Sequence, residues 1–542
     1  MPSYTLASTD GRGYAVPLST KPVTIGRNPD NELPLVTDER ASRYHAVVEP
    51  DGRGGFTIRD LGSRNGTKVN HQRIGGVEDL KAGDAIKVGN HTFVIESENS
   101  IGEARAEVRS RTIDTDKAWA AELRGLVEAL VPKGEGADDP VTMVDSRGQP
   151  TEALAGDGDG PLALRLLLLM ASKARATDIH AEPKTDRMTV RLRVDGQMIA
   201  VADMPRKPGD LLLGVVRSAC NMQMAGRDAV QDGHFSVRFR SKRVDYRVSL
   251  TPSMHGQKLV VRVLDSAGAP KSLSELGLPG YMLQRVKKTC EKDSGLLLVC
   301  GPTGSGKTTT LYNALREIDR DTTNVVTIED PVEYSIEGVT QIPVDEAKGN
   351  TFGGLLRSVL RQDPDVILVG EVRDEETART AMQAAMTGHV VFSTVHAKDT
   401  ITAVFRLLDL KVEPYLVANS LDVVLAQRLL RVLCENCKAS HRITPTQATR
   451  LGKYLEGKNQ TFDAVGCGAC LRTGYRGRRA IFEMLDFNDE LRDVVLKDPS
   501  IGAMRKTIEK GLFTTLQQSA WQLAARGSTS LEEADRVAGG GA

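Results

Sequence analysis

A glycine-rich stretch with one lysine and one threonine carries the strongest chemical signal in this sequence. Gly301, Gly304 and Gly306 precede Lys307 and Thr308 in the pattern G-x-x-x-x-G-K-T. In such a loop the backbone N–H groups surround a β-phosphate, the lysine reaches the β and γ oxygens, and the threonine hydroxyl ligates Mg²⁺. The predicted nucleotide-binding residues are Gly301, Pro302, Thr303, Gly304, Ser305, Gly306, Lys307, Thr308 and Thr309.

Two carboxylates and two histidines supply further groups that triphosphate hydrolysis needs. The reaction requires a carboxylate that orients water, a carboxylate on the metal side, and cations that stabilise the developing charge. We predict that Glu333 polarises the water and that Glu371 serves the Mg²⁺ side, with the reverse assignment left open. His389 and His396 are assigned either to sensing the γ-phosphate or to contacts with neighbouring subunits.

Two C-x-x-C pairs predict a metal site of a different kind. Cys434 and Cys437 form the first pair, and Cys467 and Cys470 form the second. Four thiolates suit the closed tetrahedral coordination of structural Zn²⁺. Disulfides are the alternative. The N-terminus lacks the apolar region of a signal peptide, so we expect a cytosolic protein, and the reducing cytosol disfavours disulfides.

Short apolar runs must hold the predicted hydrolytic groups in place. Residues 296–300, 324–328, 366–369 and 390–394 are typical of buried parallel strands. Sheets of this kind keep their ligands at the carboxyl ends of the strands. The sequence therefore predicts an α/β nucleotide-binding domain.

The N-terminal segment differs, because short β-branched runs alternate with Gly, Asn and Asp turns and predict an all-β sandwich. Its polar residues fall into three motifs in order: Gly26-Arg27, Ser42-x-x-His45 and Asn65-Gly66. Together they resemble the forkhead-associated (FHA) domain, a family that binds phosphothreonine.

The FHA resemblance implies that Arg27 and Ser42 meet the phosphate and that Asn65 holds the peptide backbone, with Arg43 and Arg64 lining the site. A phosphothreonine carries about −1.5 to −2 charges and three acceptor oxygens, which suits these groups. His45 is expected to support the loop as a packing residue.

A connector is predicted after the sandwich. Gly, Asp, Glu and Pro crowd its sequence, although Trp119 to Leu130 repeat at helical spacing. We expect one short amphipathic helix inside a flexible tether. Thr112 has a basic flank, which raises the hypothesis that a kinase converts the tether into an intramolecular FHA ligand.

Two arginines share one face of the predicted strand 188–195. Arg191 and Arg193 alternate with apolar residues, a pattern that is also typical of a plain solvent-facing strand. The surrounding block, with the runs VDYRVS and HGQKLVVRVL, resembles the second N-terminal domain of type II secretion and type IV pilus assembly ATPases. In that family arginines of this domain meet the nucleotide phosphates, which implies this role for Arg191 and Arg193, with Arg227 as a further candidate.

The same resemblance extends to residue 537. The segments around Glu333, Glu371 and the two histidines match the aspartate box, an atypical Walker B with Gly370 in place of the usual Asp, and the histidine box. The family implies a homohexamer, cytoplasmic and peripheral at the inner membrane, that binds ATP, Mg²⁺ and Zn²⁺. Its partners would be platform and recruitment proteins of a secretion or pilus machine.

The predicted fold is multidomain. The expected parts are an FHA sandwich (1–97), a linker with a short helix (98–160), an α+β second N-terminal domain (161–268), a RecA-like P-loop domain (269–430), a four-cysteine zinc module (431–485) and a helical region (486–542).

Composition bears on the competing functions. Lys+Arg and Asp+Glu are both 71, and the balanced charge, without a basic arm, argues against a nucleic-acid partner. A DNA-associated ring ATPase is therefore the weaker enzyme alternative. A phosphothreonine-dependent scaffold with a weak or degenerate ATPase is the other alternative, and the intact Lys307, Thr308, Glu333 and Glu371 oppose it.

Overall fold

The computed structural model describes residues 4–8, 15–19, 21–36, 38, 40–52, 55–70, 72–97, 118–130, 138–144, 149–154, 156, 158–223, 229–265 and 268–539. The chain divides into two compact units, residues 1–118 and 119–542, which are described separately. Thr112 and Arg227, two of the predicted residues, lie outside the described residues.

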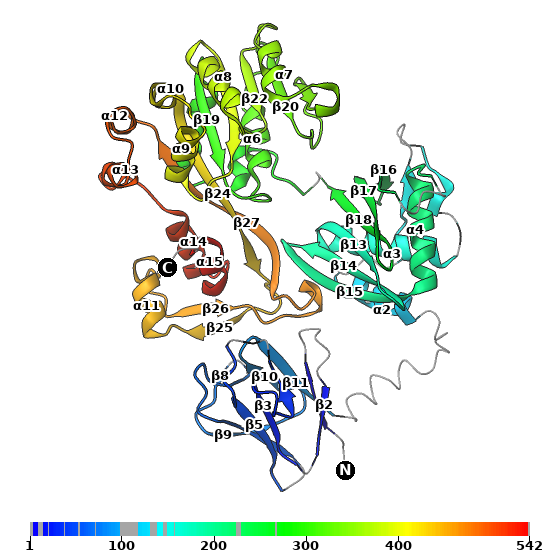
Figure 1. Ribbon diagram of the computed structural model, residues 1–542. Helices are drawn as coiled ribbons and strands as arrows, with labels where there is room; N and C mark the ends of the chain where they lie inside the picture. The colour runs from blue at the N-terminus through cyan, green and yellow to red at the C-terminus, as the bar shows by residue number, and fades with distance from the viewer. Residues whose placement is uncertain are drawn as a thin grey trace. The chain divides into compact units, whose positions relative to one another are not determined.

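The first unit is a two-sheet sandwich. Its strands are β1 (Tyr4–Ser8), β2 (Ala15–Leu18), β3 (Val23–Gly26), β4 (Leu33–Pro34), β5 (Ala46–Pro50), β6 (Phe56–Asp60), β7 (Lys68–Val69), β8 (Gln72–Arg73), β9 (Val77–Leu80), β10 (Ala85–Val88) and β11 (His91–Ser97). One sheet has the order β2-β1-β11-β10-β7-β8 and the other β4-β3-β5-β6-β9 (Figure 1). Ile25, Val48, Ile58, Ile86 and Phe93 meet in the core between them, as alternation along the strands requires. The predicted all-β sandwich is confirmed.

The second unit begins with an antiparallel sheet, which we call the β12–β18 sheet. Its elements are α2 (Ala118–Ala129), β12 (Thr142–Val144), η2 (Glu152–Leu154), α3 (Asp159–Ala174), β13 (Ala176–Pro183), β14 (Arg187–Val194), β15 (Gln197–Pro205), α4 (Arg206–Ala219), β16 (Gln231–Arg238), β17 (Arg243–Ser253) and β18 (Gly256–Leu264). The strand order is β12-β16-β17-β18-β13-β14-β15. Apolar side chains of α3 and α4 share one core with Ile179, Val190 and Leu192, which leaves the intervening polar side chains on the other face.

Part of the predicted linker belongs to this folded sheet. The expected helix forms as α2, but Trp119, Leu123 and Val127 are buried in the core of the β12–β18 sheet. The strand β12 pairs with β16. The prediction of a helix inside a flexible tether is thus corrected, because the apolar stripe of α2 finds a partner in the next domain.

A mostly parallel sheet follows, which we call the β19–β27 sheet. Its elements are η3 (Leu273–Leu276), α5 (Gly280–Cys290), β19 (Gly295–Cys300), α6 (Lys307–Arg316), β20 (Val325–Glu329), β21 (Thr340–Pro343), η4 (Glu346–Lys348), α7 (Phe352–Val359), β22 (Val366–Val369), α8 (Glu375–Met386), β23 (Val390–Val395), α9 (Thr400–Asp409), α10 (Pro414–Ser420), β24 (Leu421–Leu433) and β27 (Tyr475–Asp486). The order is β21-β20-β22-β23-β19-β24-β27, and only the β24–β27 pair is antiparallel.

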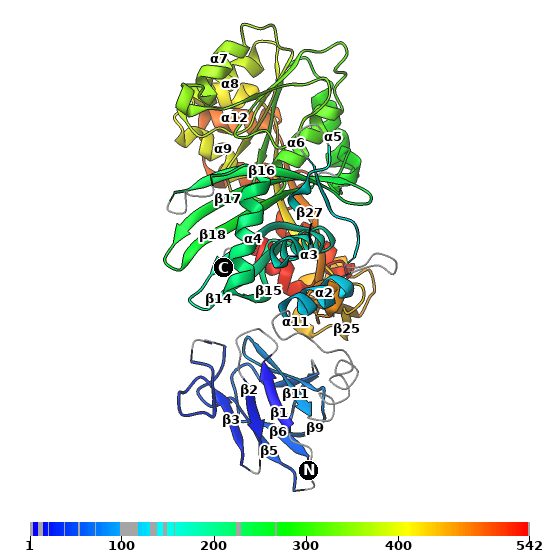
Figure 2. The ribbon, with the colours of Figure 1, turned by 90° about the vertical axis from the view of Figure 1, so that its right-hand side faces the viewer.

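Helices cover both faces of the β19–β27 sheet. The helices α7, α8 and α9 lie on one side of the sheet and α5 and α6 on the other (Figure 2). Leu296 and Leu298 of β19 share a core with α7, α8, α9 and α10, whereas Leu297 and Val299 share a core with α5 and α6. Strands buried on both faces read as continuous apolar runs, which is why the four predicted strands were visible in the sequence. The predicted α/β domain is confirmed.

The remaining elements surround the cysteine pairs and complete the C-terminal part. They are β25 (Ala439–Arg442), α11 (Pro445–Leu451), η5 (Gly452–Tyr454), β26 (Gln460–Asp463), η6 (Gly468–Cys470), α12 (Asp489–Lys497), α13 (Ile501–Ile508), α14 (Leu516–Ala525) and α15 (Leu531–Ala538). Across the described part of the chain, no helix combines the length and the apolar character that crossing a membrane requires.

Candidate functional site

The glycine loop connects β19 to α6 at the carboxyl edge of the β19–β27 sheet. Gly306 has φ of 89°, in the left-handed region that favours glycine, and it begins the helix that carries Lys307. Lys307 Nζ donates to the carbonyl of Gly301 at 2.9 Å. Burial lowers the pKa of Lys307, and the nearby charge of Glu371 opposes that shift. Arg428, which the sequence analysis missed, lies against Gly301 from the neighbouring strand β24.

Parallel pairing brings Glu371 and His396 to the same edge. Glu371 follows β22 and His396 follows β23, two strands that are paired with each other. His396 Nε2 lies 3.4 Å from Glu371 Oε2, and Arg373 forms an ion pair with the other carboxylate oxygen. The Glu371 side chain is only 15% exposed. A carboxylate held by these two groups, and close enough to act on Lys307, is placed to serve a metal bound at the loop.

Glu333 is tied to the glycine loop through the helix that follows the loop. Its backbone N–H donates to the Tyr312 hydroxyl at 3.3 Å, and that hydroxyl donates in turn to the buried carboxylate of Glu329. Gln341 Nε2 also donates to Glu329, at 3.1 Å. Burial and the Glu329 carboxylate raise the pKa of Tyr312. This network was not predicted, and its signal in the sequence is the presence of Thr327 and Glu329 in a strand whose other residues are apolar.

His389 does not join the groups at this edge. It precedes β23, and its backbone carbonyl accepts from the N–H of Gly295 at the start of β19. Its ring Nδ1 lies 3.0 Å from the carbonyl of Ala384. At about 3.3 Å per residue, the length of β23 separates it from His396 by roughly 20 Å. Within this chain the γ-phosphate role therefore has no geometric support at His389, and the subunit-contact alternative remains a prediction.

Arg191 and Arg193 lie on the polar face of the β12–β18 sheet, and each pairs with a carboxylate of β13. Arg191 Nη2 donates to Glu182 Oε1 at 2.5 Å, and Arg193 Nε lies 3.6 Å from Asp178 Oδ2. Desolvation by burial would raise the pKa of Glu182, but hydrogen bonds from Arg191 and Lys258 outweigh it, and the pKa is lowered.

A cavity of about 610 Å³ opens on the same sheet over β16, β17 and β18. Its lining includes His234, Arg247 and Arg262. Arg247 Nη2 donates to the carbonyl of Val332 at 2.8 Å, the residue directly before Glu333. Arg262 Nε donates to Asp178 Oδ1 at 3.1 Å. Arg247 and Arg262 were not among the predicted residues, although each alternates with apolar residues as Arg191 and Arg193 do.

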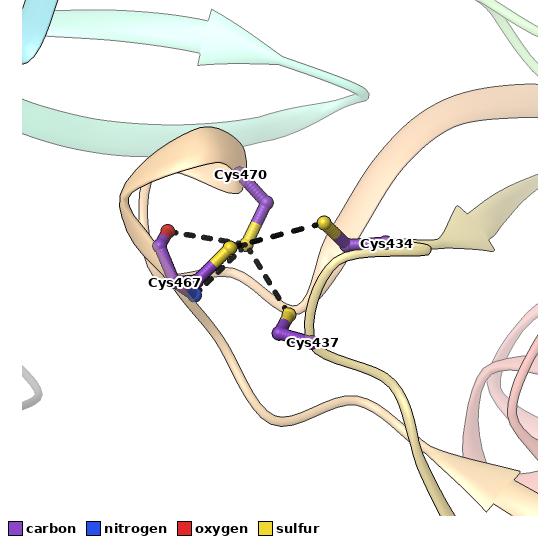
Figure 3. Close-up of side chains that lie close together, drawn as sticks. All are labelled: Cys434, Cys437, Cys467 and Cys470. Carbon is purple, nitrogen blue, oxygen red and sulfur yellow. Dashed lines mark hydrogen bonds between the residues drawn. The ribbon is translucent and has the colours of Figure 1, made fainter. Parts of the chain in front are cut away.

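The four cysteines of the two pairs converge (Figure 3). Their sulfur atoms all lie within 4.8 Å of one another. The Sγ atoms of Cys434 and Cys467 are 3.9 Å apart, and those of Cys437 and Cys470 are 3.8 Å apart. A tetrahedral Zn²⁺ with bonds of about 2.3 Å places its sulfurs about 3.8 Å from one another. The geometry fits this ion and not a disulfide, whose S–S bond is about 2.05 Å.

The second cysteine pair also contacts the β12–β18 sheet. Leu471, directly after Cys470, packs against the core of that sheet. Asp195, in the turn between β14 and β15, accepts from the backbone N–H of Gly477 at 2.7 Å. The turn between β14 and β15 therefore contacts β27, the strand that follows the cysteine cluster.

The FHA motif residues meet at neighbouring loops of the sandwich. Ser42 Oγ accepts from the backbone N–H of Arg64 at 3.0 Å, and the Ser42 carbonyl accepts from the N–H of Arg27 at 2.9 Å. Asn65 Nδ2 donates to the carbonyl of Arg40 at 2.7 Å. The side chains of Arg27, Arg64 and Asn65 are exposed, so they are open to a ligand.

His45 has the supporting role expected of it. Its ring is fully buried, its Nδ1 accepts from the backbone N–H of Ser42 at 3.1 Å, and its Nε2 lies 3.3 Å from the carbonyl of Gly66. The histidine thus links the loop of Ser42 to the loop of Asn65.

Comparisons with known proteins match both parts of the chain. The family model described as Type II/IV secretion system protein matches residues 157–536, and the FHA domain model matches residues 23–89. The type II secretion system ATPase E of Vibrio cholerae is 36% identical over 453 residues, which cover 83% of this chain and 88% of that protein.

Two further similarities concern a pilus protein and a solved structure. The type IV pilus assembly ATPase PilB of Myxococcus xanthus is 38% identical over 467 residues, which cover 85% of this chain and 80% of that protein. The X-ray structure of the Legionella pneumophila ATPase DotB has a TM-score of 0.54 at 20% identity and covers 71% of this chain and 97% of its own. The likeness to DotB shows the fold alone.

Proposed function

Because the chain belongs to the Type II/IV secretion system protein family, a family of P-loop ATPases, we propose that it hydrolyses ATP as a homohexamer and powers the assembly of a secretion pseudopilus or a type IV pilus. The observation that carries this proposal is the grouping of Lys307, Glu371 and His396 at one edge of the β19–β27 sheet. The ring would work at the cytoplasmic face of the inner membrane, against platform and recruitment proteins.

In this mechanism the glycine loop and Lys307 bind the β- and γ-phosphates, and Thr308 with Glu371 holds Mg²⁺. A Mg²⁺ held by these two residues would supply positive charge to the phosphate oxygens. Glu333 orients the attacking water, and the contact of Glu371 with His396 at the carboxyl edge of the β19–β27 sheet supports giving Glu371 the metal side. Arg191 and Arg193 then stabilise the charge that develops on the γ-phosphate.

The cysteine cluster and the sandwich have separate roles. Cys434, Cys437, Cys467 and Cys470 would hold a structural Zn²⁺ that fixes the segment between β24 and β27. The chain also carries an FHA domain, and we assign to Arg27, Ser42, Arg43, Arg64 and Asn65 the binding of a phosphothreonine protein that recruits or regulates the ATPase.

The test measures ATP turnover in size-separated oligomers of the full-length protein. Lys307→Ala and Glu371→Gln are expected to lower kcat at least ~100-fold, since each removes a group that binds the triphosphate or its metal. Lys497→Ala is the matched control, because Lys497 is an exposed lysine of α12, and its turnover should equal that of wild type. Turnover that survives in Lys307→Ala, or that is equal in monomer and ring, would contradict the proposal.

The alternatives predict other outcomes of the same assay. A DNA-associated ring ATPase would increase its turnover when DNA is added. A phosphothreonine-dependent scaffold would bind nucleotide and phosphopeptide without turnover in any oligomer.

A further inference from the structure

Five exposed arginines surround the candidate phosphothreonine site, and we call them the loop arginines. Backbone or packing contacts fix each of them to a motif residue or to a neighbouring loop. They are Arg27 and Arg64, joined to Ser42; Arg43, whose carbonyl accepts from Asn28; Arg40, whose carbonyl accepts from Asn65; and Arg73, whose guanidinium lies against Gly66.

None of the loop arginines has a carboxylate partner among the residues described for the sandwich. The acidic side chains nearby are already engaged by other groups. Asp60 accepts from Ser63 and Thr67, and Asp38 accepts from the side chain of Asn90. By contrast Arg59, on β6 of the same sandwich, pairs with Glu49 at 3.5 Å. As far as the described residues of the sandwich go, the positive charge around the candidate site is therefore not neutralised by carboxylates.

A single phosphothreonine does not use all of this charge. Its phosphate carries about −1.5 to −2 charges, which Arg27 and the Ser42 hydroxyl can pair, with Arg43 and Arg64 at the rim. Arg40 and Arg73 lie beside the Asn65-Gly66 loop, Arg40 through its backbone carbonyl on Asn65 and Arg73 through its guanidinium against Gly66. Like charges gathered in this way repel one another unless an anion is placed between them.

We propose that the ligand of the FHA domain carries further negative charge beside its phosphothreonine, and that Arg40 and Arg73 recognise that charge. The proposal rests on the phosphothreonine binding proposed above and identifies the class of partner as an acidic phosphoprotein segment. Aspartate, glutamate and a second phosphate share the required chemistry, which is an oxyanion paired with a guanidinium.

The experiment measures the affinity of the full-length protein for four synthetic peptides by fluorescence anisotropy. One peptide has a phosphothreonine flanked by neutral residues, one has the same phosphothreonine flanked by aspartates and glutamates, one carries a second phosphothreonine, and one is the acidic peptide without phosphate. The proposal expects the acidic phosphopeptide to bind about fivefold more tightly than the neutral one, since each exposed ion pair contributes modestly. The peptide with two phosphates separates a second phosphate from carboxylates as the source of the charge.

Single substitutions test whether Arg40 and Arg73 cause the preference for acidic flanks. Arg40→Gln and Arg73→Gln should remove the preference for acidic flanks while leaving the affinity for the neutral phosphopeptide within about twofold of wild type. The matched control Arg59→Gln should keep the preference. Equal binding of neutral and charged phosphopeptides would overturn this proposal and leave phosphothreonine binding intact. Failure of every phosphopeptide to bind, or binding that survives in Arg27→Ala, would overturn the phosphothreonine site itself.

Discussion

The chain has two clusters of arginines that are suited to phosphate, and the clusters differ in whether their arginines pair with carboxylates. In the sandwich the loop arginines are exposed and have no carboxylate partner among the described residues. On the β12–β18 sheet, Arg191, Arg193 and Arg262 each pair with Glu182 or Asp178. The unpaired cluster is ready for a ligand that arrives from solution. In the paired cluster the carboxylates hold the guanidinium groups in position, and a phosphate must compete with those carboxylates.

The paired cluster should give the largest effect when it is broken. Arg191→Ala and Arg193→Ala are expected to lower kcat for ATP hydrolysis about 100-fold, because in the proposed mechanism each removes a cation that stabilises the transition state. Steady-state turnover of the isolated oligomer measures this effect. Arg59→Ala is the control and should keep wild-type turnover, because Arg59 belongs to neither cluster. A change of less than about twofold in both β14 variants would mean that these arginines only maintain the sheet.

Lowering the pH should have a smaller effect, which concerns the stability that Glu182 contributes to the paired cluster. The pKa of Glu182 in the folded chain lies below its ordinary value of 4.5. Its contribution to stability is therefore complete above that value and is lost as pH falls through the lower folded pKa. At about pH 7, Glu182→Gln should lower the free energy of opening of β13 and β14 by about 1 kcal/mol, measured by amide hydrogen exchange.

The pH dependence of the Glu182→Gln effect tests whether the charge of Glu182 is responsible. The difference between wild type and Glu182→Gln should shrink as pH falls below 4.5. Asp210→Asn, which removes an exposed i,i+4 pair with Arg206, is the control and should change opening by less than about 0.5 kcal/mol. A Glu182→Gln effect that does not depend on pH would show that packing, rather than charge, is responsible.

Raising the salt concentration should produce the smallest effect, and it should weaken mainly the binding of phosphopeptide by the loop arginines. Raising ionic strength from about 50 to 200 mM should weaken phosphopeptide binding about threefold, since exposed charges are screened over a Debye length of roughly 10 Å. The stability difference caused by Glu182→Gln should stay nearly constant, because the Glu182 side chain is only 13% exposed. Titrations at several salt concentrations check both expectations, and equal salt sensitivity would remove the distinction between the clusters.

Local patterns explain what the sequence could predict. The glycine loop, the FHA motifs and the cysteine pairs are short stretches, and the buried strands read as apolar runs, so each was visible without knowledge of the fold. The contacts of Tyr312 with Glu329 and of Arg191 with Glu182 were not visible. They depend on which strands and helices become neighbours and in what register, and the sequence of one strand does not specify its partner.

Two differences between the sequence predictions and the structure, at α2 and at His389, have more specific reasons. The amphipathic stripe of α2 was recognised, but the surface that covers it belongs to α3 and the β12–β18 sheet, later in the chain. The position of His389 was in principle predictable. It precedes β23, and a residue before a parallel strand lies at the edge opposite the ligand-binding ends.

The pairing of β24 with β27 brings the two ends of the cysteine-containing segment together. The two strands pair from Val423 with Asp486 to Leu433 with Tyr475, and residues 434–474 leave and return at one end of this hairpin. Because both ends of the segment lie at one end of this hairpin, we expect that a shorter or longer segment can replace it without altering the register of the β19–β27 sheet. Such a graft must reproduce the packing of Leu471 against the core of the β12–β18 sheet and the packing of Leu451 and Leu455 against Ala525 and Leu531.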